Sequence, residues 1–281
     1  MSVHAPSHGA RELASGLHRL RAPNPGPLTG SGTNTYIVGH GETVVIDPGP
    51  ALNAHVEAIL RAVPGPIAWI LVTHAHLDHS PAARELAARS GARVAGAALP
   101  ALGRHDSSFA PDRVLADDDV IRTADVELRA VHTPGHASNH LCYWDARARR
   151  LFTGDHIIDG STVVIDPPDG DMAQYMASLR KLEALDAAVL LPGHGEPLTE
   201  PRAAIDALLA HRGRREAKVL RSVTAGQALG LEALVRVVYD DVDASLHRVA
   251  MRSLLAHLLK LEAEGRIVVE GDGWRRREPA L

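Results

Sequence analysis

The segment Thr73–His79 concentrates side chains that bind metal ions. His74 and His76 are two residues apart, which places them on one side of an extended chain, and Asp78 and His79 follow directly. Three imidazoles and one carboxylate within six residues suit a borderline cation such as zinc, and iron or manganese can occupy the same kind of site. The plain alternative is an accidental cluster of polar residues on the surface.

Three later turns each present one further ligand-type residue. Each turn follows a short apolar run, contains a glycine and then offers a histidine or an aspartate; they read TPGH at 133–136, TGD at 153–155 and LPGH at 191–194. Side chains presented at the ends of fixed strands can converge on one point. Four such strand ends disfavour an accidental cluster and predict one metal site, built from His74, His76, Asp78, His79, His136, Asp155 and His194.

Short apolar runs and helical periodicity predict the elements that hold these turns. Runs at 36–38 and 43–46 predict a hairpin, and the uninterrupted apolar run at 67–73 predicts a strand buried on both faces. Helices are expected over 52–63, 81–90 and 172–184, the second with Ser80 as its N-cap and Pro81 in its first turn. Further strands are expected at 126–131, 141–144, 151–153 and 189–191. Hairpins mixed with strand–helix–strand crossovers predict an α/β fold with helices on the outer faces of its sheets.

A different pattern begins near residue 200. Helices are expected over 201–221, 228–239 and 245–263, and a hairpin over 267–276 follows them, which is typical of a winged helix. We therefore expect two domains, residues 1–205 and residues 206–281. The first of these helices is basic in its middle, and Arg212, Arg215 and Lys218 are candidate contacts for nucleic-acid phosphates. A solvated helix and a protein-contact module are the alternative interpretations.

The HxHxDH motif, followed in order by His136, Asp155 and His194, resembles the metallo-β-lactamase superfamily over residues 30–200. The resemblance implies an αβ/βα sandwich with a two-zinc site at one edge of its sheets. It implies that one zinc ion is held by His74, His76 and His136, the other by Asp78, His79 and His194, with Asp155 bridging them. Asp47 is then expected to steady a ligand histidine, and His140 is expected either to support the site or to have a structural part only.

This ligand set implies a hydrolase. Two metal ions ~3.5–4 Å apart share a water and lower its pKa towards ~7, and the resulting hydroxide attacks a carbonyl carbon or a phosphorus centre. Asp78 and Asp155 are the residues expected to take part in this chemistry. No catalytic serine or cysteine is needed, and Cys142, in an alternating strand, is expected in the core.

Membership of such a family does not decide the substrate. Residues 32–38 and 160–164, the basic helix after residue 211 and the winged tail are similar to the beta-lactamase-like protein 2 group, whose animal members are described as single-strand-specific endoribonucleases. The leading hypothesis from the sequence is therefore hydrolysis of a phosphodiester in single-stranded RNA. The alternative is hydrolysis of a thioester or other small acyl ester, as in glyoxalase II, and a third hypothesis is a winged-helix regulator that binds nucleic acid.

Composition restricts the class of protein further. The chain has 281 residues and a net charge of −4, and its 45% hydrophobic and 23% charged residues exclude a disordered or fibrous chain. Aromatic residues make up only 3%, so there are few platforms for base stacking. With one cysteine, no membrane-length apolar run and no secretory signal, we expect a cytoplasmic protein, able to form a homodimer, that acts on a small molecule or RNA and not at a membrane.

Overall fold

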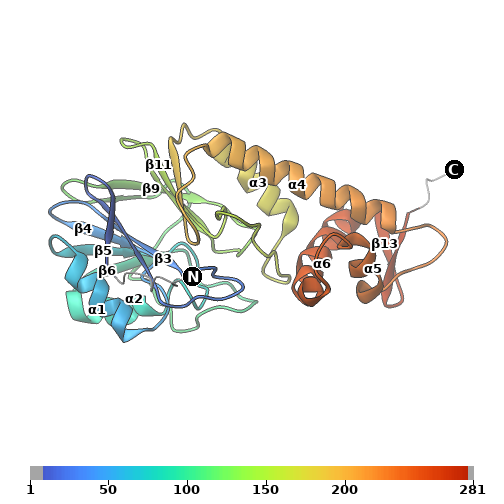
Figure 1. The fold of residues 1–281 in the computed structure, drawn as a ribbon, viewed down its shortest axis with the longest axis horizontal. Helices are drawn as coiled ribbons and strands as arrows, with labels where there is room; N and C mark the ends of the chain where they lie inside the picture. Colours follow the sequence, from blue (N-terminus) through green and yellow to red (C-terminus); the bar gives the residue numbers. More distant parts are fainter. Residues whose placement is uncertain (1–8, 278–281) are drawn as a thin grey trace, which may run out of the picture. The chain divides into compact units, whose positions relative to one another are not determined.

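The computed structural model describes residues 9–277. Its first sheet has seven strands, which lie side by side in the order of the sequence (Figure 1). They are β1 (Arg11–Ala14), β2 (Leu17–Arg21), β3 (Asn34–Val38), β4 (Thr43–Ile46), β5 (Ile67–Leu71), β6 (Arg93–Gly96) and β7 (Arg113–Val114). The pairs from β1 to β4 are antiparallel and those from β4 to β7 are parallel, so the sheet is mixed. The helices α1 (Asn53–Ala62) and α2 (Ala82–Ser90) make the first two parallel crossovers.

The second sheet has five strands in the order β12-β11-β10-β9-β8. Its members are β8 (Val120–Arg122), β9 (Glu127–His132), β10 (Leu141–Asp145), β11 (Arg150–Gly154) and β12 (Val189–Pro192). Only β11 and β12 run parallel to each other, and the connection between them contains α3 (Met172–Glu183). This sheet is therefore also mixed, and the two sheets together confirm the α/β class.

The main core lies between the two sheets, and a second apolar layer covers the other face of the first sheet. Alternate residues of β3 and β4 divide between them: Tyr36 and Ile46 belong to the core between the sheets, whereas Ile37 and Val45 pack in the layer that includes residues of α1 and α2. The ring of Tyr36 meets the ring of Phe152 from the second sheet edge to face, with centroids 5.3 Å apart. The expected sandwich, with helices on an outer face, is confirmed.

Two local features differ from the sequence expectation. Ser80 does not cap α2; its hydroxyl donates instead to Asp106 Oδ2 at 2.8 Å, and α2 begins after Pro81 without a side-chain cap. The sequence does not predict the strands β1 and β2, because their apolar and polar residues follow no regular alternation. Arg19 of β2 is buried because its guanidinium lies 2.9 Å from the carboxylate of Glu196, a partner far along the chain that periodicity cannot reveal.

The C-terminal region contains α4 (Pro201–Ser222), α5 (Leu231–Val238), the 3₁₀ helix η1 (Ala244–Leu246), α6 (His247–Ala263) and the hairpin β13 (Ile267–Glu270) and β14 (Gly273–Arg276). The helices and the hairpin share one apolar core, which includes Val219, Leu234, Leu258 and Ile267. Three helices that pack on a two-stranded wing confirm the winged-helix expectation.

The chain divides into two compact units, and the second one is larger than the expected domain 206–281. It comprises residues 134–138 and 162–185, which include α3, as well as residues 202 onward. Within this unit the backbone N–H of Ile165 donates to Ser253 Oγ at 3.1 Å, and Arg252 lies 3.3 Å from Asp166. These contacts join the α3 region to α6 across more than 80 residues of sequence. A domain boundary predicted from the sequence cannot include them, because it divides the chain at a single position.

No helix among residues 9–277 is long and apolar enough to cross a membrane.

Candidate metal centre

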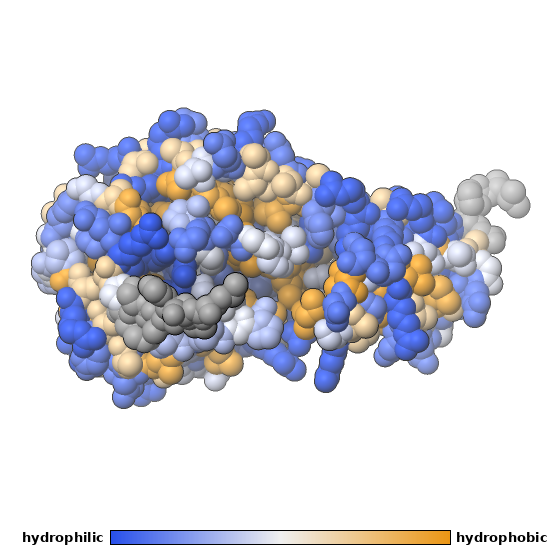
Figure 2. Space-filling model, viewed as in Figure 1, coloured by the Kyte–Doolittle hydropathy of each residue, from blue (hydrophilic) through white to orange (hydrophobic). Residues whose placement is uncertain are grey.

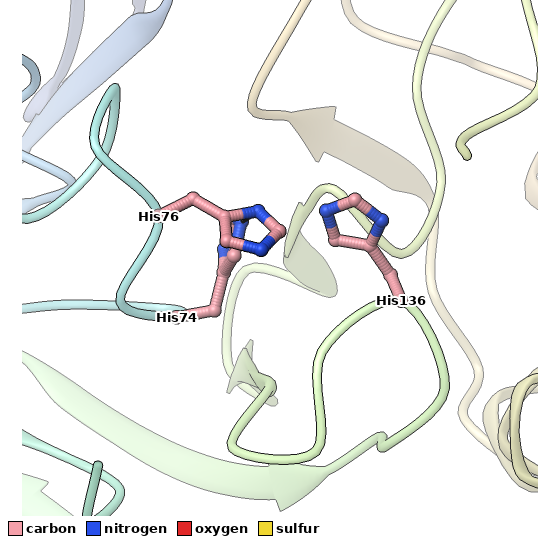
Figure 3. Close-up of side chains that lie close together, drawn as sticks. All are labelled: His74, His76 and His136. Carbon is pink, nitrogen blue, oxygen red and sulfur yellow. Dashed lines mark hydrogen bonds between the residues drawn. The ribbon is translucent and has the colours of Figure 1, made fainter. Parts of the chain in front are cut away.

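The seven predicted ligands come together in two groups. One group contains His74 and His76 from one loop and His136 from another, and their rings approach one another (Figure 3). The other group contains Asp78, His79, Asp155 and His194. Within each group the ligand atoms all lie within 4.8 Å of one another. The two groups are adjacent, because the ring centroids of His74 and His79 are 4.3 Å apart.

Glycines at the strand ends allow this close approach. The ligands of residues 74–79 follow β5, Asp155 follows β11 and His194 follows β12. A Cβ at Gly193 would lie 2.6 Å from Asp155 Oδ1 and 2.7 Å from His79 Cε1. Any side chain there would occupy the space in which these two ligands meet, so glycine is required for this geometry.

Asp47 sets the orientation of two ligand imidazoles. Its Oδ2 lies 2.9 Å from His79 Nδ1, which must carry the proton because a carboxylate can only accept. The same oxygen accepts the hydroxyl of Thr73 at 2.8 Å, and that hydroxyl oxygen therefore accepts in turn from His74 Nδ1 at 3.0 Å. One buried carboxylate thus turns the Nε2 atoms of both His74 and His79 towards the ligand groups.

Backbone carbonyls orient two further ligands in the same way. His136 Nδ1 lies 2.7 Å from the carbonyl oxygen of Val164, and His194 Nδ1 lies 3.4 Å from that of Gly32. A carbonyl can only accept, so each Nδ1 carries a proton and each Nε2 is the nitrogen left to face a metal ion. Protein acceptors on the far nitrogen are the usual support of metal-binding histidines.

The donor set of the second group fits a divalent cation. The Nε2 atoms of His79 and His194 are buried and make no hydrogen bond of good geometry, yet each lies 3.2–3.4 Å from carboxylate oxygens of both Asp78 and Asp155. Two imidazole nitrogens and two carboxylates that surround one point are the donors that zinc, iron or manganese takes.

The electrostatics of the site also favour a cation. Burial alone would lower the pKa of His194, but Asp155 and Asp78 raise it to about 10. Burial would likewise lower the pKa of His79, and the neighbouring carboxylates of Asp78, Asp155 and Asp47 hold it well above its usual value. The carboxylates thus create a strongly negative potential that favours positive charge. In contrast, burial and the nearby His79 and His76 hold the pKa of His74 well below its usual value, so His74 is neutral, the form that binds metals.

His140 holds the turn that presents Asp155. It is fully buried, and its Nε2 accepts the backbone N–H of Asp155 at 3.2 Å. Its Nδ1 therefore carries the proton and donates to Thr133 Oγ1 at 2.9 Å. Of the two roles considered from the sequence, this geometry favours the supporting one.

Sequence reasoning missed several residues that support the site. The hydroxyl of Thr73 donates to Asp47 and accepts from His74, as described above. Thr35 donates its hydroxyl to the backbone carbonyl of Asp47 at 2.6 Å and therefore accepts from His55 Nε2 at 2.8 Å. Nothing in the spacing of these residues marks them, because their roles depend on strands that become neighbours only after folding.

The predicted phosphate contacts are wrong for two of the three residues. Arg212 and Arg215 are only 2% and 8% exposed. Arg212 donates to a backbone carbonyl, and the guanidinium of Arg215 binds both carboxylate oxygens of Asp241 at 2.8 and 3.0 Å. Helical periodicity shows that this helix is basic but not which of its arginines pack inward. Lys218 is partly exposed and pairs with Asp240, and its role stays a prediction.

Comparison with known families agrees with the fold. Residues 28–194 match the family described as the metallo-beta-lactamase superfamily, and residues 231–274 match the beta-lactamase associated winged helix domain. The chain belongs to the metallo-beta-lactamase superfamily, and it is a hydrolase with a metal site of histidines and aspartates.

Relatives extend over nearly the whole chain. A "Beta-lactamase-like protein 2 homolog" of Drosophila melanogaster is 32% identical over 277 residues, which cover 92% of this chain and 91% of that protein. An "Atrochrysone carboxyl ACP thioesterase" of Emericella nidulans is 30% identical over 259 residues, which cover 90% of this chain and 81% of that one. Among solved structures, a beta-lactamase domain protein from Burkholderia ambifaria superposes with a TM-score of 0.81 at 23% identity and covers 98% of this chain and 96% of its own.

Proposed function

We propose that this chain hydrolyses a thioester, with two divalent metal ions, zinc in the first place, bound by the seven ligands. The observation that carries the choice of substrate is the similarity to the Emericella nidulans thioesterase, which extends over both the hydrolase region and the C-terminal region. The burial of Arg212 and Arg215 supports the same choice, because it removes two of the three candidate contacts for nucleic-acid phosphates.

Two groups of ligands would bind the two metal ions. His74, His76 and His136 would hold one ion, and Asp78, His79, Asp155 and His194 would hold the other. When bound, such ions lower the pKa of a water and polarise the carbonyl that it attacks. Asp47 and His140 keep the ligands in place through the hydrogen bonds described above.

Asp78 is the group placed to accept a proton during hydrolysis. Its side chain is 27% exposed, whereas those of Asp155, His194 and His79 are 11% exposed or less. Its Oδ2 accepts the Thr33 hydroxyl at 3.3 Å, which restrains the carboxylate at the open side of the group. His79 and His194 outweigh the effect of burial and hold the pKa of Asp78 well below its usual value, so Asp78 is ionised.

Hydrolysis of a phosphodiester in single-stranded RNA is the second candidate. The observation that favours it is the 32% identity to the Drosophila melanogaster protein, since the sequence resembles the same group and that group includes endoribonucleases. The metal site serves either reaction, because a carbonyl and a phosphorus centre are activated in the same way.

A side-by-side assay separates the two candidates. One metal-loaded preparation is given acetyl-N-acetylcysteamine, a small thioester, and a single-stranded oligoribonucleotide, with the Asp78→Ala variant and chelator-treated enzyme as controls. We expect thioester hydrolysis that is lost in both controls and returns when zinc, iron or manganese is added back to the chelated enzyme. RNA cleavage without thioester hydrolysis would overturn the proposal. Metal analysis of protein purified without chelator should give about two transition-metal ions per chain, and fewer than one would overturn the two-metal site.

A further inference from the structure

Helix α4 carries a row of basic side chains, three cations and one histidine, that line a groove. His211, Arg214, Lys218 and Arg221 recur at intervals of three or four residues and so lie along one face of the helix. Together with Arg215 and Asp241 they line a cavity of about 440 Å³. At ~1.5 Å per residue, the row is about 15 Å long. The helix has six arginine and lysine residues against two acidic ones, although the whole chain has a net charge of −4.

Two cations of this row have no partner among residues 9–277. The charges of Arg215 and Lys218 are compensated by Asp241 and Asp240. Arg214 and Arg221 are exposed, and no ion pair or hydrogen bond joins either side chain to another of residues 9–277. Figure 2 shows hydrophilic side chains gathered over this part of α4. The groove therefore presents positive charge that the chain itself does not neutralise.

The lining of the groove fits an acidic protein better than RNA. No aromatic side chain lines it, and the nearby Tyr239 is buried with the guanidinium of Arg215 stacked on its ring at 4.1 Å. Single-stranded nucleic acid is bound largely by stacking on exposed aromatic rings. The two exposed cations, Arg214 and Arg221, are seven residues apart and suit separate carboxylates on a protein surface.

We propose that the α4 groove docks the acidic protein that carries the acyl thioester, with Arg214 and Arg221 as the principal contacts. This inference rests on the proposed thioesterase function and names the form of its substrate: an acyl group attached to a carrier protein of net negative charge. A small thioester does not engage the groove. The contribution of the groove therefore appears only when the acyl group is presented on the carrier.

The test compares one acyl group on two carriers. Acetylated acyl carrier protein of net negative charge and acetyl-N-acetylcysteamine are assayed with wild-type enzyme, with the double variant Arg214→Glu/Arg221→Glu and with Arg236→Glu. Arg236 is an exposed arginine on α5, in the same unit but outside the groove, and so it is the matched control for a reversed charge. Glutamate and arginine have similar helix propensities, so the double variant keeps the helix.

We expect the double variant to raise KM for the acylated carrier about tenfold, with little change in kcat, because exposed interface charges act mainly on association. Hydrolysis of the small thioester should stay within about twofold of wild type, as should both substrates with the control variant. Salt should raise KM for the carrier in wild type and have less effect in the double variant.

Other outcomes overturn the docking proposal or the function separately. An unchanged KM for the carrier, with the small thioester still hydrolysed, rejects the docking site and leaves the thioesterase function intact. Failure of wild type to hydrolyse either thioester rejects the function. In that case, titration with fluorescently labelled carrier protein measures binding without catalysis. Equal affinities of the wild type and the double variant for the carrier would reject the docking site. Loss of affinity for a single-stranded oligoribonucleotide, with carrier affinity unchanged, would assign the groove to RNA instead.

Discussion

Asp47→Asn replaces one carboxylate oxygen by an NH₂ group. We expect this change to weaken metal binding at both ligand groups. In the native structure Asp47 Oδ2 accepts from His79 and, through the hydroxyl of Thr73, fixes the proton of His74 as well. An asparagine that keeps Oδ1 on the Thr73 N–H places its NH₂ group at the position of Oδ2. His79 Nδ1 then faces a donor and must release its proton, which moves to Nε2, the atom needed for the metal.

The hydrogen bonds that join Asp47, Thr73 and His74 also change direction in this variant. The Thr73 hydroxyl can accept from the new NH₂ group and then donates to His74 Nδ1, so the proton of His74 also moves to Nε2. Loss of such a supporting acceptor typically lowers metal affinity ~10–100-fold, or about 1.4–2.7 kcal/mol per ion. We expect a loss of this size at both metal positions, which a residue that supported one imidazole alone would not cause.

The assay is competition for zinc with a chelator of known affinity, combined with metal analysis and urea unfolding of the metal-free protein. Asp106→Asn is the matched control, because Asp106 is a buried carboxylate that accepts hydrogen bonds from Ser80 and Ser108 and from no ligand imidazole. Both variants should lose about 1–2 kcal/mol of unfolding free energy, since each exchanges a charged acceptor for a neutral one. If Asp47→Asn bound two ions with wild-type affinity, the assignment of protons to the histidines would be wrong.

Three further predictions follow from the packing. Gly193→Ala should reduce bound metal and hydrolysis at least tenfold, because its Cβ would touch two ligands, whereas Gly213→Ala, with open space around its Cβ in α4, should stabilise the protein by about 0.5–1 kcal/mol in urea unfolding; equal metal content in both variants would contradict the steric argument. Burial lowers the pKa of His55 in the folded protein to about 4. As the pH falls below ~6.5, the unfolded chain therefore binds a proton at His55 before the folded protein does, and the free energy of unfolding decreases between that pH and 4. Metal-free His55→Gln should therefore lose about 2 kcal/mol less than wild type between pH 7 and pH 5, and parallel stability curves would exclude this role. Arg215→Ala should lower the unfolding free energy by about 1–3 kcal/mol, because it removes a buried side chain that binds the carbonyl of Val238 and packs on the ring of Tyr239, and the exposed Arg214→Ala should change it by less than about 0.5 kcal/mol; comparable effects would mean that the two arginines are equally exposed.

The residues that bind metals could be predicted because their signal is local. The HxHxDH motif lies within one loop, and each remaining ligand follows a glycine at the end of a short apolar strand. The alternation of Tyr36, Ile37 and Val38 likewise indicates a strand with two buried faces, and the structure places its odd and even positions in different apolar layers. Such patterns need no knowledge of distant contacts, because the period of a strand and the bend at a glycine are properties of the local backbone.

What could not be predicted depends on pairs that are distant in the sequence. The acceptor that orients His194 lies 162 residues away, at Gly32, and the one that orients His136 lies 28 residues away, at Val164. The same holds for the basic helix, in which Arg215 is buried against Asp241 while Arg214, its neighbour, is exposed. The sequence by itself determined the fold class, the seven ligand residues and their order. Only the tertiary structure decided which nitrogen of each imidazole faces the metals and which cations remain free for a partner, because both depend on the acceptors that folding brings alongside.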